Sequence, residues 1–276
     1  MAWKRVKFGV AAALCAALVA GPLASAAERV TTRPGEATLP LIPDAGDVEL
    51  SAAERAKVEA GEIVVKLVER TKEDRQARAI GYLKHNPVEL WSVAGDGRLQ
   101  TEMYPEIQEF EELERWDSGK RFRATADVSI LLPDFHYTMT GCWNPSRTAL
   151  CWAQLSGDFD RNEGSQSFLW NPARRETLAV FTFDLAMKGI LSLVPESFIL
   201  SLAGHNLPSA MHSVEAMVDK VRTRDPERAA RWDAEWAALE PRLVSGDWPA
   251  RTWPPAAPST AATSASRHPS AEEPAP

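Results

Sequence analysis

The strongest constraint on this chain is one continuous pattern over residues 61–222. Half-apolar stretches of strand length, bounded by turn residues, follow one another, and a short helix near Trp91 interrupts them. The stretch closes with Met211, Val214, Val218 and Val221 at helical spacing. Strands that precede a late helix predict an α+β fold, with an antiparallel sheet and helices segregated to one side.

Both ends of the chain are expected to lie outside the folded domain. Residues 1–26 begin with basic side chains, continue with an apolar run and end in Ala24-Ser25-Ala26, the pattern of a cleaved signal peptide. The last 23 residues are mostly Pro, Ala, Ser and Thr, a composition that cannot form a core. The expected organisation is a signal peptide (1–26), a linker (27–50), one domain (51–224), an extra helix (225–246) and a disordered tail (247–276).

The signal peptide and the charge limit the compartment and the partners. A signal peptide predicts a periplasmic or secreted protein. It holds three of the 31 Lys and Arg and none of the 38 Asp and Glu, so the mature chain carries a net charge of −10. Such an acidic chain does not favour nucleic acid, and we predict no nucleic-acid partner.

Two segments predict how the domain closes. Residues 195–203 and 208–222 indicate two helices, or one long helix interrupted at Gly204 and Pro208. Asp225-Pro226 begins a further helix with Trp232 and Trp236 on one stripe.

The clearest hairpin joins residues 135–143 to residues 149–156. If Cys142 faces Cys151, the residue numbers of every facing pair in the hairpin must add up to 293. Gly141 then faces Trp152, so that a glycine without a side chain lies under an indole ring. In an oxidising compartment the two cysteines are predicted to form a disulfide. We interpret this disulfide as a bond that stabilises the fold and not as a redox-active pair.

No metal or cofactor is predicted. The histidines are scattered without a ligand spacing. Asp158, Asp160, Asn162 and Glu163 resemble the start of a calcium loop, but Gly164 comes one residue late and no bidentate Glu follows. We interpret this stretch as a polar turn.

The sequence contains no nucleophile elbow and no phosphate-binding loop. The best acid–base candidates are Asp134, His136 and Tyr137, and of these His136 and Tyr137 are retained as weak candidates. Asp134 and His136 point to one face of their strand and Tyr137 points to the other. Phe135, Tyr137, Met139 and Trp143 share one strand face, and Phe181 and Phe183 share another. Such aromatic stripes are typical of either a filled hydrophobic core or a hydrophobic ligand pocket, and the sequence does not decide between these two interpretations.

Several segments, taken in order, resemble the START-like (SRPBCC, helix-grip) superfamily, and within it the coenzyme-Q-binding and polyketide cyclase/dehydrase-type group. The matching stretches are Gly61-Glu62-Ile63-Val64-Val65, Pro87-Val88-Glu89-Leu90-Trp91-Ser92-Val93, Asp96, Met103-Tyr104-Pro105-Glu106-Ile107, Phe135-His136-Tyr137-Thr138, Glu163-Gly164-Ser165, Glu176-Thr177-Leu178 and Leu207-Pro208. The Cys142/Cys151 pair and the Trp232/Trp236 helix are additions to that pattern.

The resemblance implies a curved antiparallel sheet wrapped around a long C-terminal helix, with a hydrophobic cavity between them. Members of the superfamily mostly bind lipids, quinones, sterols or polyketides, a minority are enzymes, and no catalytic set carries over. On this basis residues 51–224 are expected to form a START-like ligand-binding domain.

The predicted function is that of an exported, non-enzymatic binder or carrier of a hydrophobic small molecule or lipid, with transient membrane contact and no cofactor. Alternatives are a cyclase or dehydratase acting in the same cavity, and a protein-interaction module with a filled core. The oligomeric state stays open. The predicted lining consists of Trp91, Met103, Tyr104, Phe135, Tyr137, Met139, Trp152, Phe181, Phe183, Phe198, Leu202 and Met211.

Overall fold

A computed structural model describes residues 30–31, 38–39, 50–71, 74–127, 134–144, 147–187 and 196–244; the side chains of residues 30–31, 38–39, 69–71, 74–75, 187, 196–205 and 244 are not part of that description. The predicted signal peptide and tail therefore lie outside the described residues. The elements are β1 (Val30–Thr31), β2 (Thr38–Leu39), α1 (Ala52–Glu59), β3 (Val64–Thr71), β4 (Asp74–Leu83), α2 (Pro87–Ala94), η2 (Gly97–Leu99), α3 (Gln100–Met103), β5 (Ile107–Trp116), β6 (Gly119–Ala126), β7 (Phe135–Trp143), β8 (Ala149–Gly157), β9 (Phe159–Asn171), β10 (Glu176–Met187), α4 (Glu196–Arg224) and α5 (Pro226–Val244).

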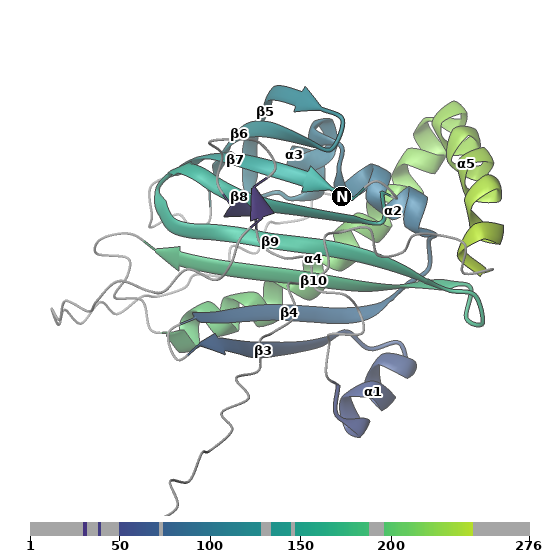
Figure 1. The fold of residues 1–276 in the computed structure, drawn as a ribbon, viewed down its shortest axis with the longest axis horizontal. Helices are drawn as coiled ribbons and strands as arrows, with labels where there is room; N and C mark the ends of the chain where they lie inside the picture. The colour runs from purple at the N-terminus through teal and green to yellow at the C-terminus, as the bar shows by residue number, and fades with distance from the viewer. Residues whose placement is uncertain are drawn as a thin grey trace, which may run out of the picture.

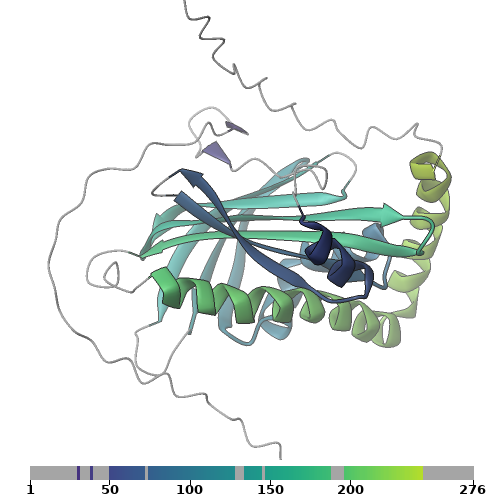
Figure 2. The ribbon, with the colours of Figure 1, turned by 90° about the horizontal axis from the view of Figure 1, so that it is seen from below.

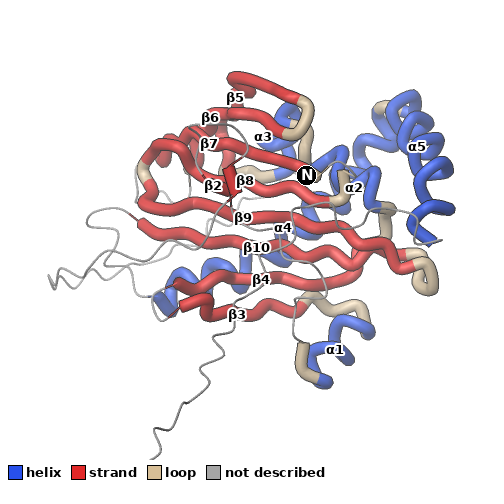
Figure 3. Tube along the Cα trace, in the orientation of Figure 1, coloured by secondary structure: helices blue, strands red, loops and turns tan. Residues whose placement is uncertain are grey.

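One eight-stranded sheet organises the molecule (Figures 1 and 3). Its strand order is β3-β4-β10-β9-β8-β7-β6-β5, and every neighbouring pair is antiparallel. Strands β5 to β10 form a meander, and β3 and β4 extend it beyond β10. The chain therefore crosses from β4, next to one edge of the sheet, to β5 at the opposite edge, and α2, η2 and α3 occupy that crossing.

The long helix α4 runs along one face of the curved sheet (Figure 2). Its residues Met211, Val214 and Val218 are fully buried, in the same core cluster as Ala79 and Phe181 of the sheet. Helix α1 covers the opposite face, where Val58 packs with Ile80 and its neighbours. The alternation of side chains along β4 explains this division, since residues 79 and 80 point to opposite faces.

Side-chain caps fix the starts of two helices. Ser51 and Glu54 form a reciprocal capping box at the start of α1. Asn86 caps α2, with Pro87 in its first turn, and the Glu89 carboxylate accepts a hydrogen bond from the backbone amide of Asn86 at 3.0 Å.

Helix α4 is continuous from Glu196 to Arg224, so the predicted interruption at Gly204 and Pro208 is wrong. Pro208 lacks the amide that would bond to the carbonyl of residue 204, which is why the sequence suggests a break. The buried side chains of Leu207 and Met211 on either side of it pack into the core. Tertiary packing therefore outweighs the local cost of one proline.

The hairpin of β7 and β8 has the predicted pairing at its closed end. Cys142 faces Cys151, and the two form a disulfide. Further along, Met139 faces Gln154 while Thr138 faces Ser156, so Leu155 is an extra residue in β8. The single register that we expected for the whole hairpin is therefore wrong beyond this bulge, which no residue type in the sequence announces.

The acidic stretch that we interpreted as a polar turn is mostly strand. Residues from Phe159 onward belong to β9, and only Asp158 stands between β8 and β9. Polar residues lie in this strand because part of its outer face is itself polar and buried: Ser165 and Thr182 share a hydrogen bond of 2.7 Å there. Hydrophobic alternation alone could not identify such a strand.

Helix α5 packs into the main core. Trp232 and Leu239 are buried in the cluster that also contains residues of α2 and α4. Arg228 of α5 also donates to Asp96 after α2, at 2.9 Å. Within the described residues, no helix is both long and apolar enough to cross a membrane.

Candidate functional site

A cavity of about 320 Å³ lies between the concave face of the sheet and α4. Strands β5 to β10 form its walls, the segment from α2 to β5 contributes Ala94, Gly95, Gln100 and Tyr104, and Leu207 and Ala210 of α4 close it. Most lining side chains are apolar. The volume lies at the lower end of the range of about 300–1,000 Å³ that is typical of small-molecule sites.

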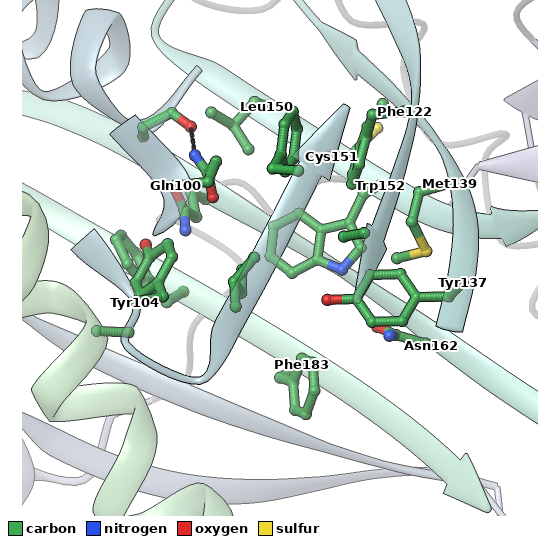
Figure 4. A pocket seen from close by; sticks show the side chains of 18 of the residues that line it. Gln100, Tyr104, Phe122, Tyr137, Met139, Leu150, Cys151, Trp152, Asn162 and Phe183 are labelled. Atoms are coloured by element: carbon green, nitrogen blue, oxygen red, sulfur yellow. Dashed lines mark hydrogen bonds between the residues drawn. The ribbon is translucent and has the colours of Figure 1, made fainter. Parts of the chain in front are cut away.

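The indole of Trp152 lies in the middle of the cavity in Figure 4, between one end marked by Gln100 and Tyr104 and another marked by Tyr137 and Asn162. Trp152 faces Gly141 on β7 and Gly164 on β9. A β-carbon on Gly164 would lie 2.4 Å from the Trp152 ring, whereas one on Gly141 would meet nothing closer than 3.4 Å. The predicted pairing of Gly141 with Trp152 is therefore confirmed, but the indole lies over the other facing glycine, Gly164.

At the Tyr137 end, the phenol ring packs against Phe159, with ring centroids 5.9 Å apart. Burial raises the pKa of Tyr137 to about 12, and the charge of Glu106 adds to the shift. The hydroxyl is therefore neutral at physiological pH and can donate or accept one hydrogen bond. Met139 and Phe183 line the same region and give it a flexible and an aromatic surface (Figure 4).

At the other end, Gln100 donates to the Ala94 carbonyl at 3.0 Å (Figure 4). Burial also raises the pKa of Tyr104, whose hydroxyl is hydrogen-bonded to the side chain of Gln166. The Oε1 atom of Gln166 is buried and has no hydrogen-bond partner among the described residues. Gln100, Tyr104 and Gln166 are neutral polar groups, and the exposed Glu106 also lines the cavity.

Lys120 of β6 also lines the cavity, although only 7% of the residue is exposed. Its Nζ donates to the Gly95 carbonyl at 2.8 Å and lies 5.1 and 5.5 Å from the ring centroids of Phe110 and Phe122. Burial lowers the pKa of Lys120 to about 8, against the opposing influence of the nearby Glu112 carboxylate. The cavity wall thus carries an ammonium group.

The eight-stranded antiparallel sheet wraps around one long helix and encloses an apolar cavity, and this arrangement identifies the fold. It is the START-like helix grip. No protein-family model matches the sequence, and no curated protein matches it.

Three solved structures similar to this helix-grip protein are distant from it in sequence. The Zhui aromatase/cyclase of a Streptomyces is 17% identical, with 55% of this chain and 97% of that chain covered and a TM-score of 0.48. A START superfamily protein of Mycobacterium smegmatis is 18% identical, with 53% and 98% covered and a TM-score of 0.45. Human STARD10 is 12% identical, with 74% and 89% covered and a TM-score of 0.48. Because these TM-scores are all below 0.5, the fold assignment depends on the topology described above and not on these similarities. No ligand of this chain is inferred from them.

The predicted lining residues divide into three groups in the helix-grip structure. Six of them line the cavity: Tyr104, Tyr137, Met139, Trp152, Phe181 and Phe183. Four are not among its lining residues: Met103 and Met211 are buried in the main core, Trp91 packs against that core, and Phe135 stacks on Phe159. The side chains of Phe198 and Leu202 lie outside the described part of the chain.

The acid–base candidates are separated by the sheet. The side chain of His136 is 68% exposed, and its Nδ1 lies 3.6 Å from Asp158. Tyr137 points into the cavity instead (Figure 4). His136 therefore has no access to a molecule held there. Among the described residues, no three His, Cys, Asp or Glu side chains gather in a way that could hold a metal ion.

Sequence reasoning missed the polar residues of the lining. The predicted lining contains no charged or amide side chain, whereas Lys120, Asn162 and Gln166 all line the cavity. Lys120 precedes Phe122, Ala124 and Ala126 at alternating positions, and all four line the cavity. Extending this alternation by two residues toward the N-terminus, from Phe122 to Lys120, could have identified the lysine as a lining residue.

Proposed function

We propose that the protein binds a hydrophobic small molecule or lipid between the sheet and α4 and does not change it chemically. One observation carries the proposal: the core contains a cavity of about 320 Å³ with a mostly apolar lining. Burial of one methylene group in such a site contributes about 0.8 kcal/mol, so a modest ligand gains useful affinity. The interaction-module alternative required a core without such a space.

Absence of chemical turnover is part of the proposal. In the described lining, Tyr104 and Tyr137 have raised pKa values and remain neutral, so neither acts as a base near pH 7. His136 lies on the outer surface. We expect a ligand recovered from the protein to be unchanged in mass after prolonged incubation. A changed mass that depends on Tyr137 would instead favour the cyclase or dehydratase alternative.

Two matched variants test the binding site. Ala210 of α4 lines the cavity, whereas Ala230 of α5 is exposed. We expect Ala210→Phe to fill part of the cavity and to weaken binding of the neutral fluorescent probe N-phenyl-1-naphthylamine by about tenfold or more. Ala230→Phe should leave the affinity within about twofold, because it adds the same ring to a helix outside the cavity. Equal affinity of both variants and the wild type would contradict the proposed site.

Export is the second part of the proposed function. The signal-peptide pattern of residues 1–26 supports it, and the Cys142–Cys151 disulfide is compatible with an oxidising compartment. In an envelope with two membranes, the protein would act as a carrier that contacts membranes transiently. N-terminal sequencing of the protein from the envelope fraction should begin at Ala27. Recovery of the chain in the cytoplasm with residues 1–26 attached would refute export.

A further inference from the structure

Lys120 holds an unusual position for a lysine. Among the described lining residues it is the only cation and Glu106 is the only carboxylate, and the Lys120 ammonium group lies near two phenylalanine rings. Its stem passes over Gly141, where a β-carbon would be 3.8 Å from Cγ of the lysine. Buried lysines are rare unless they are paired, because removing an ammonium group from water is costly.

The carboxylates nearest to Lys120 already have partners. Glu112 accepts two hydrogen bonds from Arg115, at 2.6 and 2.5 Å. Asp96 accepts hydrogen bonds from the side chains of both Arg98 and Arg228. Within the described chain, no carboxylate lies within ion-pair distance of the Lys120 ammonium group. Its charge is therefore left without a close counter-ion.

A purely structural role explains only part of this arrangement. The Gly95 carbonyl lies at the C-terminal end of α2, where a cation is favoured by the helix dipole. One carbonyl oxygen accepts one of three N–H groups, however, and it carries no full charge. A second partner with a negative charge would complete the site, and the cavity is where such a partner can enter.

We infer that the cavity takes an amphiphile with a carboxylate group, and that the ammonium group of Lys120 binds this carboxylate. The inference rests on the proposed function and adds the chemical class of the ligand. The apolar part of the ligand extends past Trp152 toward Tyr137 and Phe183 (Figure 4). The small volume of about 320 Å³ favours a single chain or a compact ring system over a lipid with two chains.

Three probes with the same chain test the inference: dodecanoate, methyl dodecanoate and dodecanol. At pH 7, we expect the wild type to bind dodecanoate about tenfold or more tightly than either neutral probe. In Lys120→Met and Lys120→Gln this preference should disappear, while both neutral probes retain their affinity within about threefold. Lys57→Met, at an exposed position of α1, is the matched control and should behave as the wild type does.

The pH dependence provides a readout that loss of packing would not produce. The charged groups that face Lys120 are Glu112 and Arg115 of β5 and Asp96 of the turn after α2, and all three keep their charge between pH 7 and pH 9.5. The preference for dodecanoate should therefore fall across this interval as Lys120 loses its proton, and the affinity for the ester should not change.

The outcomes separate this inference from the proposed function. Tight binding of all three probes with no preference, unchanged in Lys120→Met, would overturn the carboxylate and leave hydrophobic binding intact. If the folded wild type binds none of the probes, and also fails to bind N-phenyl-1-naphthylamine, the cavity is not a ligand site and both proposals fall. A preference lost in both lysine variants but kept in Lys57→Met supports the inference.

Discussion

The ring of Trp152 covers Gly164 so closely that a β-carbon at residue 164 would lie 2.4 Å from its Cζ2 atom. The same β-carbon would be 2.4 Å from the carbonyl oxygen of Thr182, which belongs to the hydrogen-bonded neighbouring strand. The glycine thus lets the indole lie low on the sheet and leaves space above it. The shape of the cavity floor depends on this pair.

Gly164→Ala is therefore expected to destabilise the fold. Neither the backbone oxygen nor the ring can move away cheaply, so we expect a loss of about 1–3 kcal/mol in the free energy of unfolding. Gly141→Ala, on the other strand that pairs with β8, meets no atom closer than 3.4 Å and should change it by less than about 0.5 kcal/mol. Urea denaturation measures both, and equal effects would show that Gly164 has no special role.

A second prediction concerns the link between α5 and α2. Arg228 donates to Asp96 at 2.9 Å and to the Ser92 carbonyl at 3.2 Å, and its side chain is 16% exposed. Arg228→Met removes a hydrogen-bond donor from both the Asp96 carboxylate and the Ser92 carbonyl, so it should lower the free energy of unfolding by about 1–3 kcal/mol. Arg231→Met, on the exposed face of the same helix, should be nearly neutral. Thermal unfolding of both variants gives the comparison.

The same link predicts a dependence on acid. Burial alone would raise the pKa of Asp96, but the hydrogen bonds from Arg98 and the charge of Arg228 lower it to about 2. Because the folded-state pKa lies below the ordinary value, the contribution of the carboxylate is complete above about pH 4 and is lost as the pH falls through 2. The stability advantage of the wild type over Asp96→Asn should shrink in that window and stay constant from pH 5 to pH 7.

The disulfide provides a third prediction. It closes a loop between residues nine positions apart, and loop-closure entropy for such a loop corresponds to about 2–3 kcal/mol. The double variant Cys142→Ala, Cys151→Ala should lose this amount of unfolding free energy. A reductant should lower the wild-type midpoint to a similar extent and leave that of the double variant unchanged. A wild type that is indifferent to reductant would mean that the bridge contributes no stability.

A fourth prediction follows from the pKa of Lys120, which is lowered by burial from 10.5 to about 8. Between these two values the unfolded chain binds the proton more readily than the folded protein does, so the unfolding free energy should rise with pH in this interval. The gain of the wild type relative to Lys120→Met should be on the order of 1–3 kcal/mol by pH 10.5. A flat difference from pH 7 to pH 10.5 would show that the ammonium group is not buried.

Periodic signals in the sequence predicted most of the framework. The apolar stripe of α4 is a local pattern and the pairing of Cys142 with Cys151 depends on a single register, and both predictions are confirmed. The bulge at Leu155 and the continuity of α4 through Pro208 are set by tertiary packing. No local propensity encodes these two features.

The cavity could be predicted only in part because apolar lining and apolar filling look alike in a sequence. Tyr137 and Phe135 are two residues apart on the same strand, yet the first faces open space and the second stacks on Phe159. Curvature of the sheet decides between them, and curvature arises from the contacts of all eight strands. The buried lysine was not among the predicted lining residues, because lysines are rarely buried.

Native mass spectrometry of the protein purified from its own cells tests the central claim most directly. We predict a folded species that carries one non-covalent hydrophobic molecule, which organic extraction releases, and an Ala210→Phe variant whose occupancy is at least about tenfold lower. A wild-type protein that is folded and reproducibly empty, with the same spectrum as Ala210→Phe, would contradict the account.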